Sequence, residues 1–196
     1  LFPFLTLFML VVGLTVGTVV VRYLWPQETE DRLNIVATGS AQDPFAALER
    51  AETGTGVTVS IVPEQGEALD AAAIYQKCVP SIVSLWAESA ESYSTGTGII
   101  MSADGYLLTN AHVVAGSERV YAALYDDTIL EAKLVGADAQ ADVAVLKVEA
   151  EGLSPAEFGD SDQLQCGEMV VAIGDPLGYR TSITQGIVSA LDRIVN

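Results

Sequence analysis

A glycine-rich stretch that ends near the only histidine of the chain constrains the fold most strongly. An apolar run with two glycines (95–101) is followed by the pair Asp104-Gly105, which is typical of a tight β-hairpin turn. Residues 106–109 then form the predicted returning strand, and His112 follows that strand almost directly. We therefore predict that His112 lies where a hairpin meets a short turn or helical piece, at the edge of a rigid scaffold.

Asp142 gives His112 a chemical partner. It opens the apolar strand 142–148, thirty residues further along the chain. A histidine that acts as a general base needs a carboxylate, normally buried, that fixes its tautomer and stabilises the imidazolium. His before Asp, with the nucleophilic Ser last, is one of the chain orders in which Ser-His-Asp triads occur. A lone histidine would be interpreted as structural, so the pair, rather than His112 alone, predicts catalysis.

Five blocks of the sequence resemble the HtrA/Deg family of trypsin-like serine proteases in their order and spacing. The blocks are Thr-Asn-Ala-His-Val-Val (109–114), the strand 142–148, Gly-Asp-Ser-Asp (159–162), 170–178 and 186–191. The resemblance runs from about Ala72 to the last residue. It implies an all-β fold of the trypsin/chymotrypsin type with two β-barrels. It also implies that His112 is the general base and that Asp142 orients it.

The nucleophile and the oxyanion hole are not visible in the sequence. In the family that the chain resembles, both come from a Gly-Asn-Ser-Gly-Gly turn, and no such turn occurs in the 196 residues. The resemblance therefore implies that the catalytic serine lies beyond Asn196, and that the chain by itself is inactive. Its site residues are then His112 and Asp142.

Ser161 is a misleading candidate for the nucleophile. The tripeptide Gly159-Asp160-Ser161 matches the start of a Gly-Asp-Ser-Gly-Gly turn, but Asp162 follows where a glycine is needed. A carboxylate at that position would oppose the negative charge that develops on the oxyanion. We expect Ser161 to cap a turn instead, with the neighbouring carboxylates hydrogen-bonded to local amides.

The N-terminal segment 1–25 is predicted to be a transmembrane helix. Its first 21 residues carry no charged side chain, and a helix of that length spans roughly 30 Å, the thickness of a bilayer core. Arg22 and Trp25 follow as expected at a membrane interface, and Pro26 ends the helix. A cleaved signal peptide is the alternative, although no small-residue cleavage site is evident before Trp25. The resemblance implies a single-pass protein of the cell membrane with its protease domain on the extracytoplasmic side.

Residues 26–70 are predicted to be an acidic disordered linker. Nine acidic side chains stand there against Arg32 and Arg50, and the segment shows no sustained periodicity. Residues 57–62 can form an isolated strand, without an obvious partner. A receptor or ligand function for this stretch is the alternative to a solvated spacer.

Residues 71–196 are predicted to be the protease domain, incomplete at its C-terminus. Short strands separated by Gly and Asp turns, at intervals of roughly 8–12 residues, indicate an antiparallel barrel. We expect a helical piece at 70–77. The first barrel is expected to consist of strands at 81–87, 97–109 (as a hairpin), 118–125, 129–136 and 142–148. A crossing segment at 149–167 then leads to strands at 168–174 and 182–191, which begin the second barrel.

The composition excludes several classes of function. With 26 acidic and nine basic side chains and a net charge of −17, the chain lacks the clustered cations that bind nucleic acid or anionic lipid. One histidine and two distant cysteines make no zinc pattern, and Gly96-Thr-Gly98 lacks the third glycine of a dinucleotide fingerprint. No cofactor or metal is therefore expected. Cys78 and Cys166 are either joined in one disulfide or are two buried free thiols.

The resemblance implies a serine endopeptidase of the extracytoplasmic quality-control type, acting on unfolded or damaged proteins. It also implies assembly as a homotrimer and a PDZ domain downstream. One departure from the family is Asp175, where an Asn is more usual. Two other classes of function remain open: a non-catalytic membrane-anchored chaperone or adaptor, and a single-pass receptor whose acidic tether is the functional part.

Overall fold

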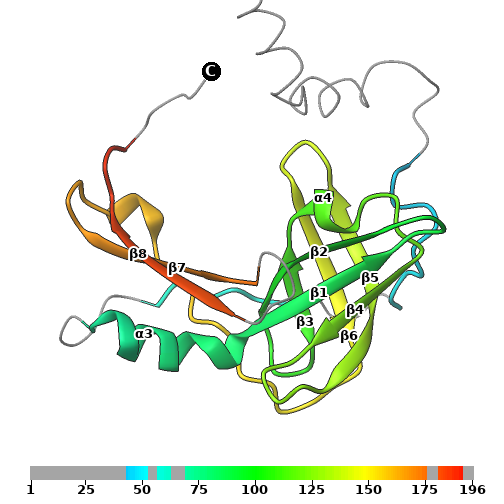
Figure 1. The fold of residues 1–196 in the computed structure, drawn as a ribbon, viewed down its shortest axis with the longest axis horizontal. Helices are drawn as coiled ribbons and strands as arrows, with labels where there is room; N and C mark the ends of the chain where they lie inside the picture. The colour runs from blue at the N-terminus through cyan, green and yellow to red at the C-terminus, as the bar shows by residue number, and fades with distance from the viewer. Residues whose placement is uncertain (1–42, 53–56, 63–68, 176–180, 192–196) are drawn as a thin grey trace, which may run out of the picture. The chain divides into compact units, whose positions relative to one another are not determined.

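A computed structural model describes residues 43–52, 57–62, 69–175 and 181–191, whose regular secondary structure is mostly β-strand (Figure 1). Its helices are short pieces: α3 (Ala71–Cys78), the 3-10 turn η1 (Val79–Ser81), α4 (Ala111–Val114) and the 3-10 turn η2 (Ser161–Gln163). Its strands are β1 (Ile82–Glu88), β2 (Tyr93–Ile100), β3 (Tyr106–Thr109), β4 (Arg119–Ala123), β5 (Ile129–Asp138), β6 (Val143–Val148), β7 (Met169–Gly174) and β8 (Ser182–Ile187). These positions agree closely with the expected elements.

The first six strands form a closed barrel, which confirms the first of the two expected barrels. The strands follow one another around it in the order β1-β2-β3-β6-β5-β4, and every neighbouring pair is antiparallel. Because successive side chains of a strand point to opposite faces, alternate residues of β1 fill the interior. Val83, Leu85 and Ala87 are each almost fully buried, while their neighbours are only partly covered.

The predicted hairpin between β2 and β3 is confirmed, and Gly105 explains its tight turn. The residue has φ = +101°, a conformation that side chains rarely adopt, and a Cβ at this position would lie 2.3 Å from the carbonyl oxygen of Val148. The N–H of Met101 donates to the carbonyl of Tyr106 at 2.8 Å and closes the turn. The hairpin thus delivers the chain to α4 at one end of the barrel.

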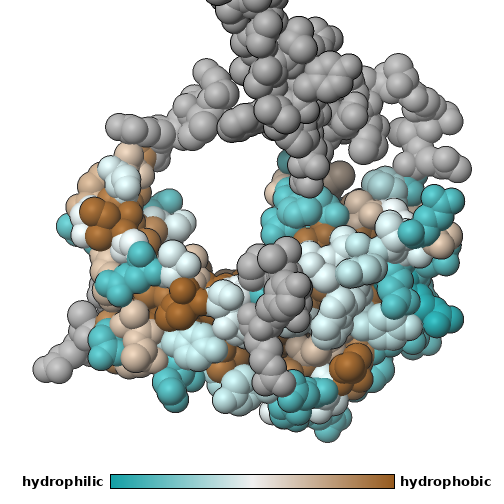
Figure 2. Space-filling model, in the orientation of Figure 1, coloured by the Kyte–Doolittle hydropathy of each residue, from teal (hydrophilic) through white to brown (hydrophobic). Residues whose placement is uncertain are grey.

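A two-stranded antiparallel sheet, β7–β8, stands where the second barrel is expected. Every residue of β8 is exposed, including the large apolar Ile183 and Ile187. Hydrophobic residues therefore lie on the surface in this part of the molecule (brown, at the left of Figure 2). A polar link ties the end of β7 to the barrel: the backbone N–H of Asp175 donates to the hydroxyl of Thr97 on β2 at 2.8 Å.

Part of the predicted disordered linker is ordered. Residues 44–52, which we call the strap, pack against the first barrel and bury Phe45 and Leu48, each only 5% exposed. The physical reason is that these two side chains join the hydrophobic core, which offsets the entropy lost on ordering the segment. Further along, Ile61 forms an isolated parallel bridge with Phe158, so the possible strand at 57–62 does have a partner. Residues 26–42 lie outside the described residues.

The structure also bears on the predicted transmembrane helix and on the two cysteines. Among the described residues no helix is long and apolar enough to cross a bilayer, and the predicted transmembrane segment 1–25 lies outside those residues. Cys78 and Cys166 are not joined: both are free thiols. Cys78 is partly buried and Cys166 is exposed, so neither the bridge nor the pair of buried thiols is observed.

Candidate active site

The short helix α4 carries His112 and holds it outward from the barrel. Three of its four residues, Ala111, Val113 and Val114, are buried, so the fourth is turned to the outside, and the side chain of His112 is 65% exposed. Strand β2 approaches α4 closely through Gly96, where a Cβ would lie 2.7 Å from both methyl groups of Val113. The pair of glycines that partly matches a nucleotide-binding pattern is therefore used for packing.

Asp142 lies in the turn between β5 and β6 and adopts an unusual backbone conformation. Its φ is +52°, in the left-handed region that Asp tolerates better than most side chains. Asn110, the residue before α4, holds it there: its side-chain amide donates to the Asp142 carbonyl and to its carboxylate, both at 3.1 Å. The turn thereby aims the carboxylate at the first turn of α4.

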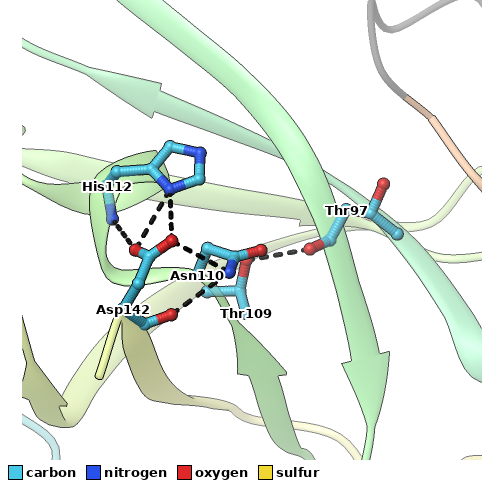
Figure 3. A network of polar contacts seen from close by, with 5 residues as sticks. All are labelled: Thr97, Thr109, Asn110, His112 and Asp142. Carbon is cyan, nitrogen blue, oxygen red and sulfur yellow. Dashed lines mark hydrogen bonds and ion pairs between the residues drawn. The ribbon is translucent and has the colours of Figure 1, made fainter. Parts of the chain in front are cut away.

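The structure brings His112 and Asp142 into direct contact (Figure 3). Nδ1 of the imidazole lies 2.8 Å from Oδ2 and 3.1 Å from Oδ1 of the carboxylate. The backbone N–H of His112 also donates to Oδ1, at 2.9 Å. An amide in the first turn of a helix has no partner within the helix, so Asp142 satisfies it from a distant part of the chain.

This contact fixes the tautomer of the imidazole. An ionised carboxylate can only accept hydrogen bonds, so Nδ1 of His112 must carry the proton that is shared with Asp142. In the neutral ring the lone pair then resides on Nε2, the nitrogen that faces away from Asp142 (Figure 3). The arrangement can therefore take a proton at Nε2 from a hydroxyl placed beside it.

The surroundings of Asp142 lower the pKa of its carboxyl group below the ordinary value. The largest cause is the hydrogen bond from the backbone N–H of His112, followed by the hydrogen bond from its imidazole. Partial desolvation acts in the opposite direction, and the amide of Asn110 adds a smaller lowering effect. Asp142 is thus held as the carboxylate anion that the imidazole needs as an acceptor.

The expected burial of the carboxylate is not observed. The side chain of Asp142 is 44% exposed, because it lies in a turn at the end of the barrel rather than within a strand. Water therefore screens the attraction between the carboxylate and an imidazolium, and the two hydrogen bonds that His112 donates provide most of the orientation.

Two supporting residues were not predicted from the sequence. Asn110 occupies the cap position of α4, yet its side chain makes no cap hydrogen bond and reaches Asp142 instead. Thr109, buried at the end of β3, donates from its hydroxyl to the carbonyl of Thr97 at 2.8 Å (Figure 3). An Asn immediately before a short helix is a signal that could have drawn attention to the first; nothing in the sequence marks the second.

Ser161 is placed in η2, and its expected role as a cap is wrong. Asp160 is the cap residue, because its carboxylate accepts from the backbone N–H of Asp162 at 3.1 Å and from the side chain of Gln163 at 3.0 Å. Within the described part of the chain, no group of three or more His, Cys, Asp or Glu side chains is arranged to hold a metal ion.

Comparisons with known proteins agree with this geometry. The model of the trypsin-like peptidase domain family matches residues 96–195, a range that contains both His112 and Asp142. A probable periplasmic serine endoprotease DegP-like of Ectopseudomonas mendocina (strain ymp) is 54% identical over 103 residues, which are 53% of this chain and 22% of that protein. The putative serine protease HhoB of Synechocystis sp. (strain ATCC 27184 / PCC 6803 / Kazusa) is 54% identical over 99 residues, 50% of this chain and 24% of that protein.

Solved structures give the same relationship. The HtrA-type protease AlgW with tripeptide has a TM-score of 0.61 at 39% identity, over 64% of this chain and 42% of that one. The serine endoprotease from Yersinia pestis has a TM-score of 0.59 at 34% identity, over 65% and 47%. The match thus spans less than a quarter of the length of the two curated relatives. The chain therefore belongs to the trypsin-like peptidase domain family, and its homologues include DegP-like and HtrA-type serine proteases.

Proposed function

We propose that this chain is part of a serine endopeptidase that degrades unfolded or damaged proteins outside the cytoplasm. The observation that carries the proposal is the hydrogen bond of 2.8 Å between Nδ1 of His112 and the carboxylate of Asp142. A binding module has no need of a histidine whose tautomer is fixed and whose second nitrogen is exposed. In this proposal His112 is the general base and Asp142 orients it.

The nucleophilic serine is proposed to follow Asn196, in the Gly-Asn-Ser-Gly-Gly turn that the 196 residues do not contain. In the reaction, Nε2 of His112 removes the proton of the serine hydroxyl as its oxygen attacks the peptide carbonyl. The imidazolium that forms is stabilised by Asp142 and then gives the proton to the leaving amine. Backbone N–H groups of the same turn would stabilise the oxyanion.

The 196 residues alone are proposed to be inactive, because removing the nucleophile of such a triad abolishes most of the chemical rate. Attachment to the membrane through residues 1–25, assembly as a homotrimer and a PDZ domain downstream belong to the same proposal. The relatives that are named periplasmic endoproteases support the extracytoplasmic location.

A fluorophosphonate probe tests the proposal, because it labels only an activated serine. The full-length protein should be labelled, and His112→Ala should abolish the labelling. Ser161→Ala is the matched control, since Ser161 lies in η2 and should leave the labelling intact. The isolated 196-residue chain should remain unlabelled. Absence of labelling in the full-length protein would instead favour a non-catalytic chaperone or adaptor.

A further inference from the structure

The edge of β5 is not covered along its whole length by β4. Strand β4 pairs with β5 only from Ile129 to Ala132. The later residues of β5 pair on their other edge with the start of β6, up to the pair Asp138 and Val143. Asp142 directly precedes that last pair. The part of the barrel that supports Asp142 would therefore have an open edge if the six strands were all that closed it.

The strap, residues 44–52, fills this edge. The N–H of Leu134 on β5 donates to the carbonyl of Glu49 at 2.8 Å, and the N–H of Ala51 donates to the carbonyl of Leu134 at 2.9 Å. With the strap in place Leu134 is only 1% exposed, so the strap both shields this edge from water and satisfies the two backbone groups of Leu134. Buried backbone groups need such partners, so these two hydrogen bonds fix where the strap docks on β5.

The same strap also reaches the element that carries His112. The carbonyl of Pro44 accepts from the N–H of Gly116 at 2.7 Å, two residues after the end of α4. Phe45 and Leu48 are joined by a turn in which the N–H of Leu48 donates to the carbonyl of Phe45 at 3.2 Å. Both side chains belong to the same buried cluster as residues 111, 113 and 114 of α4.

We propose that Phe45 and Leu48 are positioning residues. They anchor the strap against β5 and against the residues that follow α4, and thereby keep His112 and Asp142 within hydrogen-bond distance of each other. His112 comes from α4 and Asp142 from the turn before β6, and the strap is hydrogen-bonded to Gly116 after α4 and to Leu134 on β5. The strap precedes residues 96–195, the range that matches the family model. The functional meaning of this inference rests on the proposed function, but its test does not use turnover.

Amide hydrogen exchange on the full 196-residue chain measures strap docking and dyad geometry separately. The amides of Leu134 and Gly116 donate to the strap, and the amide of His112 donates to Asp142. In Phe45→Ala we expect all three to exchange faster by roughly tenfold or more, because the buried anchor is lost. The amide of Leu85, in β1, makes no hydrogen bond to the strap and should keep its slow exchange. The pKa of the Asp142 carboxyl, followed by carbon NMR, should rise towards its ordinary value.

Glu49→Gln is the matched control within the strap. It removes the exposed ion pair of 2.7 Å between Glu49 and Lys133 but keeps the backbone bonds and the apolar anchors, so exchange should stay as in the unaltered chain. Phe45→Leu, unlike Phe45→Ala, should keep the slow exchange of the His112 amide and the low pKa of Asp142, because leucine still fills most of the buried site.

Two outcomes would overturn the proposal. In one, Phe45→Ala speeds exchange at Leu134 and Gly116 while the His112 amide and the Asp142 carboxyl do not change. In the other, none of these groups responds. If Leu85 also exchanges faster, the whole barrel has opened, and the same criteria are applied to the milder Leu48→Val. A failed serine-labelling experiment would not change the exchange rates or the pKa of Asp142. The proposed protease function and the proposed role of the strap can therefore fail independently.

Discussion

The carboxylate of Asp142 holds His112 at two points, the ring nitrogen Nδ1 at 2.8 Å and the backbone N–H at 2.9 Å. One contact sets the orientation of the ring and the other fixes the start of α4 relative to the turn before β6. Because both depend on the same side chain, the position of the helix and the tautomer of the imidazole are coupled.

Replacing Asp142 by Asn should lower kcat of the full-length enzyme by roughly 10⁴-fold. The amide of Asn can donate to Nδ1, which favours the tautomer that carries its proton on Nε2. In that tautomer Nε2 has no lone pair with which to accept the proton of the serine hydroxyl. The measurement is the initial rate of cleavage of a fluorescently labelled unfolded protein. Asp162→Asn, the same change at an exposed position in η2, should leave the rate unchanged. A rate within roughly tenfold of the unaltered enzyme would argue against an orienting role for Asp142.

The stability of the chain should depend on pH through Asp142. Its pKa is lower in the folded than in the unfolded state, so the unfolded state binds the proton more readily. The stabilisation is therefore fully present above the ordinary pKa, about 4, and is lost as pH falls through the lowered pKa of the folded state. Urea unfolding of the chain and of Asp142→Asn, between pH 7 and pH 2, should show a difference that shrinks only below about pH 4. A difference that is constant over the whole range would contradict the assignment.

Gly96→Ala should destabilise the chain and loosen α4. The added Cβ would lie 2.7 Å from two methyl groups of Val113, a buried and β-branched residue that cannot easily rotate away. We expect a loss of about 1–3 kcal/mol in the free energy of unfolding, measured with urea. Gly136→Ala on β5 is the matched control, because no heavy atom lies within 4 Å of its added Cβ. Equal effects of the two substitutions would show that contact with α4 is not the cause.

Thr109→Val should cost about 1 kcal/mol of the free energy of unfolding. Valine has nearly the same shape, but it removes the hydroxyl that donates to the carbonyl of Thr97 at 2.8 Å in a buried position. Thr109→Ser keeps this donor and should retain the hydrogen bond to Thr97. If valine is as stable as threonine in urea unfolding, the hydrogen bond between β3 and β2 contributes nothing measurable.

Much of the barrel could be predicted because the signals are local. The pair Asp104-Gly105 marks a turn, and only glycine adopts φ = +101° beside the carbonyl of Val148 without a clash. Alternation of apolar residues, as in β1, follows from the two-residue period of a strand. The pairing of His112 with Asp142 was predicted from residue types, chain order and family resemblance, and the two side chains are in contact.

The sequence by itself therefore determined the positions of the strands along the chain, the hairpin before His112 and the identity of its partner. Only the tertiary structure decided that Asn110 holds Asp142 instead of capping α4, that this carboxylate is 44% exposed, and that an acidic segment with two apolar anchors docks at Leu134. The physical reason is distance along the chain. Turn and strand signals arise between neighbouring residues. The contacts decided by the tertiary structure join groups far apart in the sequence, which meet only when the strands of the barrel pair in their correct register. That pairing also leaves part of one edge of β5 uncovered by β4.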